Sequence, residues 1–246
     1  MNAKPRLDQL LTDRGLADSK SHAQALIMAG MVFSGERRLD KPGTAIPPDS
    51  PLEVRGKQHP WASRGGIKLA HGLDHFAIDP SGAVALDIGA STGGFTDVLL
   101  SRGAVRVYAV DVGRGQLSWK LRQDSRVVVL EGTNARHLDR DQVPEAPGLI
   151  VCDASFIGLA TVLPAALALA APEARLIALI KPQFEAARED VEKGGVVRDA
   201  SVHQAVCERV RDWLDGVAGW TVLGIEESPI TGPEGNVEYL IAAHRG

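Results

Sequence analysis

Four charged residues lie in or directly after apolar stretches, where a charge is costly unless it is paired or functional. Asp153 follows the run LIVC, Lys181 follows LIALI, Lys68 lies in SRGGIKL and Glu238 lies in GPEGNVEYL. Two lysines and two carboxylates could move a proton and steady the charge that develops in a reaction. Two structural lysine–carboxylate salt bridges would also account for these four residues. The residue types alone therefore do not distinguish a catalytic role from a structural one.

A glycine-rich turn, DIGASTGGFTD at residues 87–97, connects an apolar run to a helix-like stretch, which is typical of the entrance to a nucleotide pocket. Its glycines are Gly89, Gly93 and Gly94, so the spacing is not that of the G-x-G-x-x-G dinucleotide motif, and no P-loop lysine follows. Asp111 ends the next apolar run, where α/β folds place an acid that binds ribose hydroxyls. These features together predict a nucleoside pocket, for a dinucleotide or for S-adenosylmethionine.

The elements that must position these residues alternate between strands and helices from residue 83 onward. Seven strands are expected, at AVALDI (83–88), RVYAVDV (106–112), RVVVL (126–130), LIVCDA (149–154), RLIALIK (175–181), WTVLGIEE (220–227) and EYLIAA (238–243). The alternation predicts an α/β fold with a mainly parallel sheet covered on both faces. The last two strands have no room for a crossover helix, so they should be antiparallel neighbours. A parallel sheet with an antiparallel strand at its end is the Rossmann-like architecture of class I methyltransferases.

The first 60 residues follow a different pattern and predict a small α+β domain. Two short amphipathic helices, RLDQLLTDRG and KSHAQALIMAG, end at Gly15 and Gly30, which suit left-handed caps. MVFSG and PLEVRG are expected to be short strands. Nine Lys and Arg against seven Asp and Glu give this segment a net charge of +2, while the rest of the chain carries −6. The excess favours a phosphate-binding face only weakly, because a solvated surface has the same signature.

Composition bounds the class of protein. The 246 residues are 44% hydrophobic with two cysteines, which indicates a globular protein in a reducing compartment. The start MNAKPRLDQLL lacks the apolar core of a secretion signal. Pro164, Pro172, Glu173 and Arg175 interrupt the most membrane-like stretch, so no span is expected. We therefore expect a cytoplasmic protein without a membrane partner, monomeric by default, with a domain at 1–60, a linker at 61–66 and a second domain at 67–246.

Over nearly its whole length the sequence resembles the TlyA family, in which an S4-type RNA-binding domain precedes an FtsJ-like ribose methyltransferase. The S4 resemblance rests on R-L-D-x-L-L, G-L-A-x-S-K and A-x-x-L-I-x-x-G-x-V. The FtsJ-like resemblance rests on SRGGIKL, DIGASTGGFTD, VDVGRGQL, KPQFE, KGGVVRD and GPEGNVEYL. The resemblance implies S-adenosylmethionine as cofactor and ribosomal RNA within ribosomal subunits as partner.

The resemblance also assigns roles to residues. The family's Lys-Asp-Lys-Glu tetrad falls on Lys68, Asp153, Lys181 and Glu238, with Lys181 as base or alkoxide stabiliser and no metal required. The expected cofactor-binding residues are Asp87, Gly89, Ser91, Gly93, Gly94, Phe95, Thr96, Asp111, Val112, Asn134 and Asp153. The expected RNA-binding residues are Arg6, Lys20, Arg37, Arg38 and Arg64.

The activity implied is that of an S-adenosylmethionine-dependent rRNA (cytidine-2′-O)-methyltransferase. Two other classes of protein are less consistent with the sequence. A membrane-lytic protein, suggested by the family's older name "hemolysin A", should carry a long apolar or strongly amphipathic segment, which is lacking here. A non-catalytic RNA-binding protein of the ribosome would have no need of the tetrad, yet all four of its residues are present.

Overall fold

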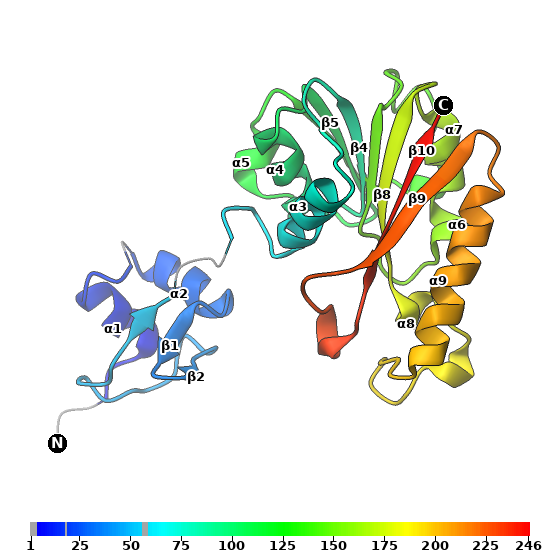
Figure 1. The fold of residues 1–246 in the computed structure, drawn as a ribbon. Coiled ribbons are helices and arrows are strands. Elements are labelled where there is room, and N and C mark those ends of the chain that lie inside the picture. The colour runs from blue at the N-terminus through cyan, green and yellow to red at the C-terminus, as the bar shows by residue number, and fades with distance from the viewer. Residues whose placement is uncertain (1–3, 18, 56–58) are drawn as a thin grey trace. The chain divides into compact units, whose positions relative to one another are not determined.

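The computed structural model describes residues 4–17, 19–55 and 59–246. It divides into two units, Met1–Pro60 and Trp61–Gly246 (Figure 1). The first unit contains one cluster of buried hydrophobic residues and the second contains two. In the part of the chain that is described, no helix is long and apolar enough to cross a bilayer.

The first unit packs two helices on a small antiparallel sheet. The helices are α1 (Leu7–Asp13) and α2 (Lys20–Met28), and the strands are β1 (Val32–Ser34), β2 (Arg37–Arg38) and β3 (Glu53–Val54) in the order β2-β1-β3. Gly15 and Gly30 have φ values of 67° and 69°, the left-handed caps expected from the sequence. The strand β2 was not predicted, because two residues are too few to show an alternating pattern.

The second unit is built on a seven-stranded sheet with the order β6-β5-β4-β7-β8-β10-β9. Its strands are β4 (Val84–Ile88), β5 (Arg106–Asp111), β6 (Val127–Glu131), β7 (Leu149–Cys152), β8 (Ala174–Ile180), β9 (Trp220–Glu227) and β10 (Tyr239–Arg245). The predicted mainly parallel, methyltransferase-like sheet is confirmed. All seven strand predictions correspond to strands of this sheet, with small differences at the ends.

Helices cover both faces of this sheet (Figure 1). The helices are α3 (Gly65–His75), α4 (Gly94–Ser101), α5 (Trp119–Arg122), α6 (Leu159–Val162), α7 (Pro164–Leu169), α8 (Pro182–Glu185) and α9 (Ala200–Asp215). Residues of α3, α4 and α5 share one core cluster, and residues of α6, α7 and α9 share the other. Short 3₁₀ turns form at Ala135–His137, Arg188–Asp190 and Pro233–Gly235.

The antiparallel strand lies inside the sheet rather than at its end. β10 pairs antiparallel with both β8 and β9, so the predicted antiparallel pairing of the last two strands is confirmed, whereas the expected end position is wrong. The hydrophobic pattern explains the difference, because Leu240, Ile241, Ala242 and Ala243 are all fully buried. A strand buried on both faces belongs in the interior of a sheet.

Candidate active site

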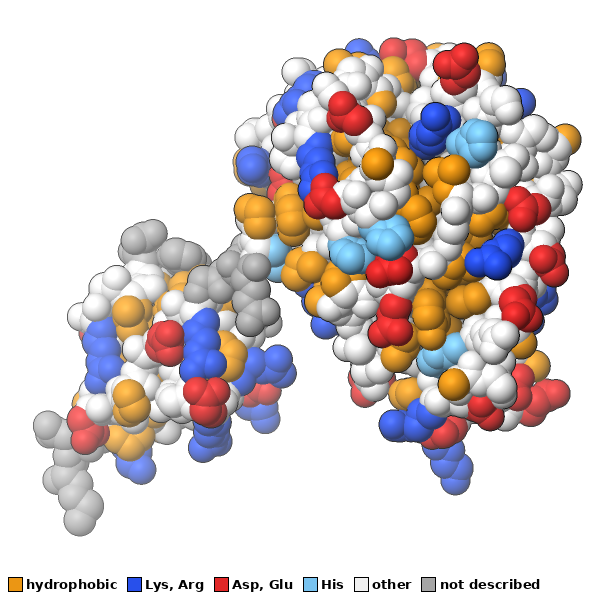
Figure 2. Space-filling view, viewed as in Figure 1, with side chains coloured by type: hydrophobic (Ala, Val, Ile, Leu, Met, Phe, Trp, Pro, Cys, Tyr) orange, Lys and Arg blue, Asp and Glu red, His pale blue; other side chains and the backbone are white. Residues whose placement is uncertain are grey.

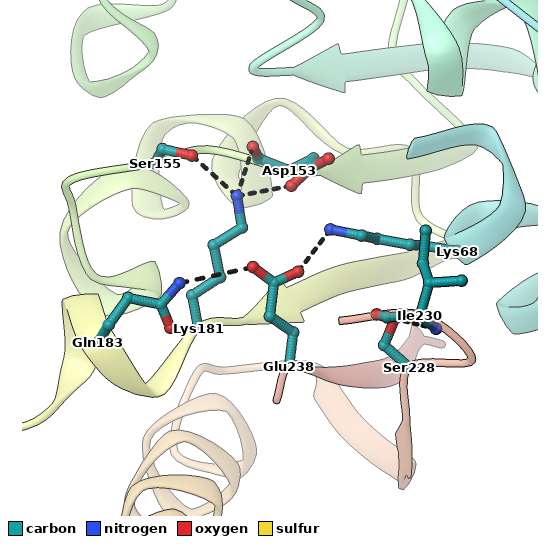
Figure 3. Close-up of polar contacts among 8 residues, drawn as sticks. All are labelled: Lys68, Asp153, Ser155, Lys181, Gln183, Ser228, Ile230 and Glu238. Atoms are coloured by element: carbon teal, nitrogen blue, oxygen red, sulfur yellow. Dashed lines mark hydrogen bonds and ion pairs between the residues drawn. The ribbon is translucent and has the colours of Figure 1, made fainter. Parts of the chain in front are cut away.

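The four predicted tetrad residues come together as two ion pairs in one cavity. Lys68 Nζ lies 2.5 Å from Glu238 Oε2, and Lys181 Nζ lies 2.6 Å from Asp153 Oδ1 (Figure 3). The side chains of Lys68, Lys181 and Glu238 are at least nine-tenths buried, and that of Asp153 is 22% exposed. All four line a cavity of about 290 Å³. Each buried lysine is thus paired with a carboxylate, and both pairs line the same cavity.

Local structure fixes each of these side chains. Asp153 follows β7, and Lys181 follows β8 at the point where Pro182 begins α8. The Lys181 ammonium also donates to the Asp153 carbonyl oxygen at 3.1 Å and to Ser155 Oγ at 2.9 Å. Three oxygens therefore hold this nitrogen in place at the carboxyl edge of the sheet, where α/β folds bind their ligands.

Glu238 is positioned by the loop that precedes β10. Its Oε1 accepts a hydrogen bond of 3.5 Å from Gln183 Nε2, while its Oε2 contacts Lys68. Gly232 lies so close to this carboxylate that a Cβ at position 232 would collide with Glu238 Oε1. The predicted stretch GPEGNVEYL therefore contains a glycine that makes room for the acid.

Asn236, which the sequence reasoning missed, ties this loop to the segment KGGVVRD. Its side chain is buried; Oδ1 accepts from the Val197 amide at 3.2 Å, and Nδ2 donates to the Gly195 carbonyl at 3.0 Å. Asn236 lies within the family-like stretch that was quoted for Glu238, but nothing in a single sequence indicates its partners.

A second cavity, of about 470 Å³, lies between the glycine turn and the ends of β4, β5 and β7. Asp111 lines it, and its carboxylate accepts hydrogen bonds from the Ser91 amide at 2.8 Å and the Gly113 amide at 2.7 Å. Gly89, Ser91, Asp153 and Ser155 line both this cavity and the tetrad cavity. The two cavities therefore adjoin.

The glycine turn needs its glycines. Gly89 has a φ of 81°, and a Cβ there would lie 2.9 Å from Ala154 Cα. Gly93 has a φ of 97°, and a Cβ there would overlap the Leu121 side chain. Both positions combine a left-handed backbone with close packing, which only glycine tolerates.

Other predicted cofactor-binding residues are divided between the two cavities. Val112 and Asn134 line the larger cavity, and Asn134 Oδ1 also accepts from the Arg136 amide at 3.1 Å. Gly94 and Phe95 line the tetrad cavity instead.

Asp87 and Thr96 are fully buried and line neither of these two cavities. Thr96 Oγ1 donates to Asp87 Oδ2 at 2.6 Å, and burial raises the pKa of Asp87 to about 7. Their hydrogen bond connects β4 to α4 on the two sides of the glycine turn.

Phe156 is a further residue at the cavity rim that the sequence reasoning missed. It lines the larger cavity, is 89% exposed and has a φ of 65°, which is rare for a bulky side chain. Its ring lies 4.9 Å from that of Phe184. Backbone conformations of this kind are concentrated at functional sites. Its place in DASF, three residues after Asp153, is the only signal in the sequence.

The predicted RNA-binding residues fall on both units. Lys20, Arg37 and Arg38 are exposed in the first unit, where Figure 2 shows several Lys and Arg side chains on the visible face. Arg6 is half exposed, and its guanidinium contacts the buried Asp8 at 2.8 Å, which lowers the pKa of Asp8. Arg64 belongs to the second unit, where it is exposed and lines the tetrad cavity.

Comparison with protein families matches both units. Residues 61–245 match the FtsJ-like methyltransferase model, and residues 5–50 match the S4 domain model. The 16S/23S rRNA (cytidine-2′-O)-methyltransferase TlyA of Mycobacterium tuberculosis is 46% identical over 246 residues, covering 98% of this chain and 90% of its own length. Hemolysin A of Brachyspira hyodysenteriae is 39% identical, covering 96% of this chain and 98% of its own length.

Two solved structures are similar to this chain over different shares of its length. A Streptococcus thermophilus protein has a TM-score of 0.75 and 40% identity, covering 100% of this chain and 90% of its own. The magnesium protoporphyrin IX methyltransferase of Synechocystis, solved with bound SAM, has a TM-score of 0.50 and 15% identity, covering 74% of this chain and 81% of its own. At that identity the likeness concerns the fold alone.

Proposed function

Because this chain belongs to the FtsJ-like methyltransferase family and, with its S4 domain, to the TlyA family, we propose that it methylates a ribose 2′-hydroxyl of cytidine in ribosomal RNA, using S-adenosylmethionine. The observation that carries the proposal is the junction of the two cavities at Asp153. A nucleoside-sized cavity on one side and a buried lysine pair on the other suit a transfer between two bound molecules.

The polar groups that line the larger cavity, and its volume of about 470 Å³, suit S-adenosylmethionine. Asp111 offers a carboxylate for ribose hydroxyls, and the Cβ-free Gly89 leaves room close to the backbone. Val112 and Asn134 line the part of the cavity that would hold the adenine, and Ser91 and Asp153 line the side facing the tetrad. When bound, the cofactor supplies an electrophilic methyl group on sulfur.

The tetrad acts on the attacking hydroxyl. A ribose hydroxyl is a poor nucleophile, so charge must be stabilised as its proton leaves. Lys181 is positioned by Asp153 and Ser155 either to stabilise the developing alkoxide as an ammonium or, in its neutral amine form, to accept that proton. Lys68, paired with Glu238, supplies a second fixed cation in the same cavity. The pairing also keeps both cations from being buried without a counter-charge.

The first unit would bring the substrate to the site. Lys20, Arg37 and Arg38 are exposed cations that suit phosphate contacts, and Arg64 at the rim of the tetrad cavity would contact RNA close to the reacting ribose. Phe156 offers an exposed ring on which a nucleobase could stack. Ribosomal subunits, in which the target RNA is folded, are the substrate expected for such a two-part enzyme.

The test replaces Lys181 and measures methyl transfer from labelled S-adenosylmethionine to purified ribosomal subunits. Lys181→Ala should reduce turnover by at least about 10²-fold, the contribution of a general base, while S-adenosylmethionine affinity is retained. Lys181→Arg should fail as well, because a guanidinium does not release its proton at working pH. Lys120→Ala, at a lysine whose side chain is 84% exposed, is the control and should retain activity.

Two outcomes would contradict the proposal. Near-normal turnover by a folded Lys181→Ala protein would remove the tetrad from the chemistry. A wild-type protein that binds ribosomal subunits but transfers no methyl group would instead favour the non-catalytic RNA-binding alternative.

A further inference from the structure

Two histidines and a glutamate lie together away from the two cavities. His71 and His75 belong to α3, and Glu226 belongs to the edge strand β9. Residues four apart on a helix project from the same face, here toward β9. One ligand atom from each of the three side chains lies within 4.8 Å of the others. We call these three residues the His–Glu cluster.

The ligand atoms of the His–Glu cluster are spaced slightly more widely than ligands around a bound cation. His71 Nε2 lies 3.5 Å from Glu226 Oε1, and His75 Nε2 lies 3.8 Å from Glu226 Oε2. These distances are long for hydrogen bonds. A tetrahedral zinc ion with bonds of about 2.0–2.1 Å would hold its ligand atoms roughly 3.3–3.4 Å apart. Small side-chain rotations would therefore close the cluster around one ion.

The surroundings of His71 Nε2 also favour a bound metal ion. Its Nε2 is shielded from solvent, and no hydrogen-bond partner for it occurs among residues 4–17, 19–55 and 59–246. A shielded polar atom without a partner is costly. An imidazole nitrogen facing a carboxylate and a second imidazole is satisfied by a shared metal ion, because all three groups are ligands.

We propose that the His–Glu cluster binds one divalent first-row transition-metal ion, zinc foremost. Two imidazoles and one carboxylate are a donor set that zinc takes, and two histidines four apart on a helix are a spacing known for zinc. The side chains are 35%, 42% and 36% exposed, so an ion can enter from solvent. Figure 2 shows histidine side chains beside acidic ones on the surface over α3 and β9.

The bound ion would fasten α3 to the edge of the sheet. α3 carries Lys68 one turn before His71, and β9 is joined to the rest of the sheet through β10. The ion is thus a structural clamp beside the catalytic helix, separate from the methyl-transfer site.

The test uses the full chain without a histidine tag, stripped of metal by a chelator. Titration with zinc chloride in a calorimeter should give one ion per chain, and cobalt(II) should give the visible absorption of a tetrahedral site. His71→Gln, His75→Gln and Glu226→Gln should each weaken zinc binding by at least about tenfold. His137→Gln, at an exposed histidine after the opposite edge strand β6, is the matched control and should bind as the wild type does.

Thermal unfolding gives an independent measurement. Zinc at a hundredfold excess over its dissociation constant should raise the unfolding midpoint of the wild type by about 5–10 °C and leave the three variants nearly unchanged. The replaced side chains are partly exposed, so the variants should fold, as circular dichroism would verify. Zinc binding weaker than millimolar, or binding that the three variants retain, would overturn the proposal.

Discussion

At the residue scale, Asp111 both holds the glycine turn and lines the larger cavity. Its carboxylate already accepts from the amides of Ser91 and Gly113, which fixes the glycine turn against the loop after β5. In the function that we propose, this carboxylate would also accept hydrogen bonds from ribose hydroxyls in the larger cavity, which Asp111 lines. Replacing Asp111 should therefore weaken cofactor binding in two ways, by loosening the glycine turn and by removing an acceptor for the ligand.

Asp111→Ala should therefore weaken S-adenosylmethionine binding by roughly 1–3 kcal/mol, because it removes a charged acceptor and leaves two amides unmatched. Isothermal titration calorimetry measures the change directly. Asp141→Ala, at an exposed aspartate outside both cavities, is the matched control. Equal affinities for wild type and Asp111→Ala would remove this residue from the cofactor site.

Asp87 gives the folded protein a distinctive pH dependence. Its pKa is 3.8 in the absence of the fold and about 7 when it is buried. At pH values between these two pKa values, Asp87 keeps its proton in the folded protein and has lost it in the unfolded chain. The contribution of Asp87 to the free energy of unfolding is therefore complete below pH 4 and is lost as the pH rises to about 7.

Asp87→Asn should remove that loss, because an amide accepts from Thr96 without ionising. Denaturant unfolding from pH 4 to pH 8 should show the free energy of unfolding of the variant rising relative to that of the wild type by about 1.4 kcal/mol per pH unit, up to about pH 7. Asp141→Asn should follow the wild-type curve. Parallel curves for wild type and Asp87→Asn would mean that Asp87 is ionised in the folded protein throughout this range.

At this scale the sequence predicted the residues that carry charge in apolar surroundings, and the structure brings Lys68, Asp153, Lys181 and Glu238 together. It did not reveal Asn236 or Phe156, because a polar contact to a distant backbone and a positive φ leave no local pattern. The spacing of His71 and His75 was visible, but Glu226 becomes their neighbour only when the sheet forms.

At the scale of elements, the loop before β10 is the support on which Glu238 depends. Asn236 connects it to the segment around Gly195 and Val197, two loops that are distant in sequence. The strands were predictable from their apolar runs, whereas these loops have no periodicity. Their conformation is set by partners that only the folded chain brings near.

Asn236→Ala should lower the turnover number of methyl transfer while leaving the affinity for S-adenosylmethionine unchanged, because the residue supports Glu238 and lies outside the cofactor cavity. The unpaired Val197 amide should also cost about 1–3 kcal/mol of stability. Kinetics on ribosomal subunits and denaturant unfolding measure the two effects. Glu234→Gln, an exposed position in the same loop, should alter neither, and an unimpaired Asn236→Ala enzyme would refute the supporting role.

At the scale of the whole molecule, charge is divided between the units. The first 60 residues carry a small positive excess and the remainder a net charge of −6, although the reaction we propose takes place in the acidic part. A polyanionic substrate would be repelled by that part alone. RNA affinity should therefore depend on the first unit.

Reversing Lys20, Arg37 and Arg38 to glutamate in the full chain should abolish methylation of ribosomal subunits while S-adenosylmethionine still binds. Wild-type activity should also fall steeply with added salt, because phosphate contacts release counterions. Arg140→Glu with Arg211→Glu, two exposed reversals on the second unit, is the comparison and should have a much smaller effect. Subunit methylation that survives the triple reversal would show that the first unit does not target the enzyme.

The interior position of β10 also governs the order in which the molecule is assembled. Within the described chain, β9 pairs only with β10, although β10 is synthesised after it. A growing chain therefore presents β9 with no partner, and the edge of β8 stays open until β10 inserts between them. Glu238 immediately precedes β10, and Lys68 is synthesised 170 residues before it. The ion pair between them therefore forms only when β10 inserts into the sheet. A nascent chain therefore lacks the Lys68–Glu238 ion pair until its final strand has closed the sheet.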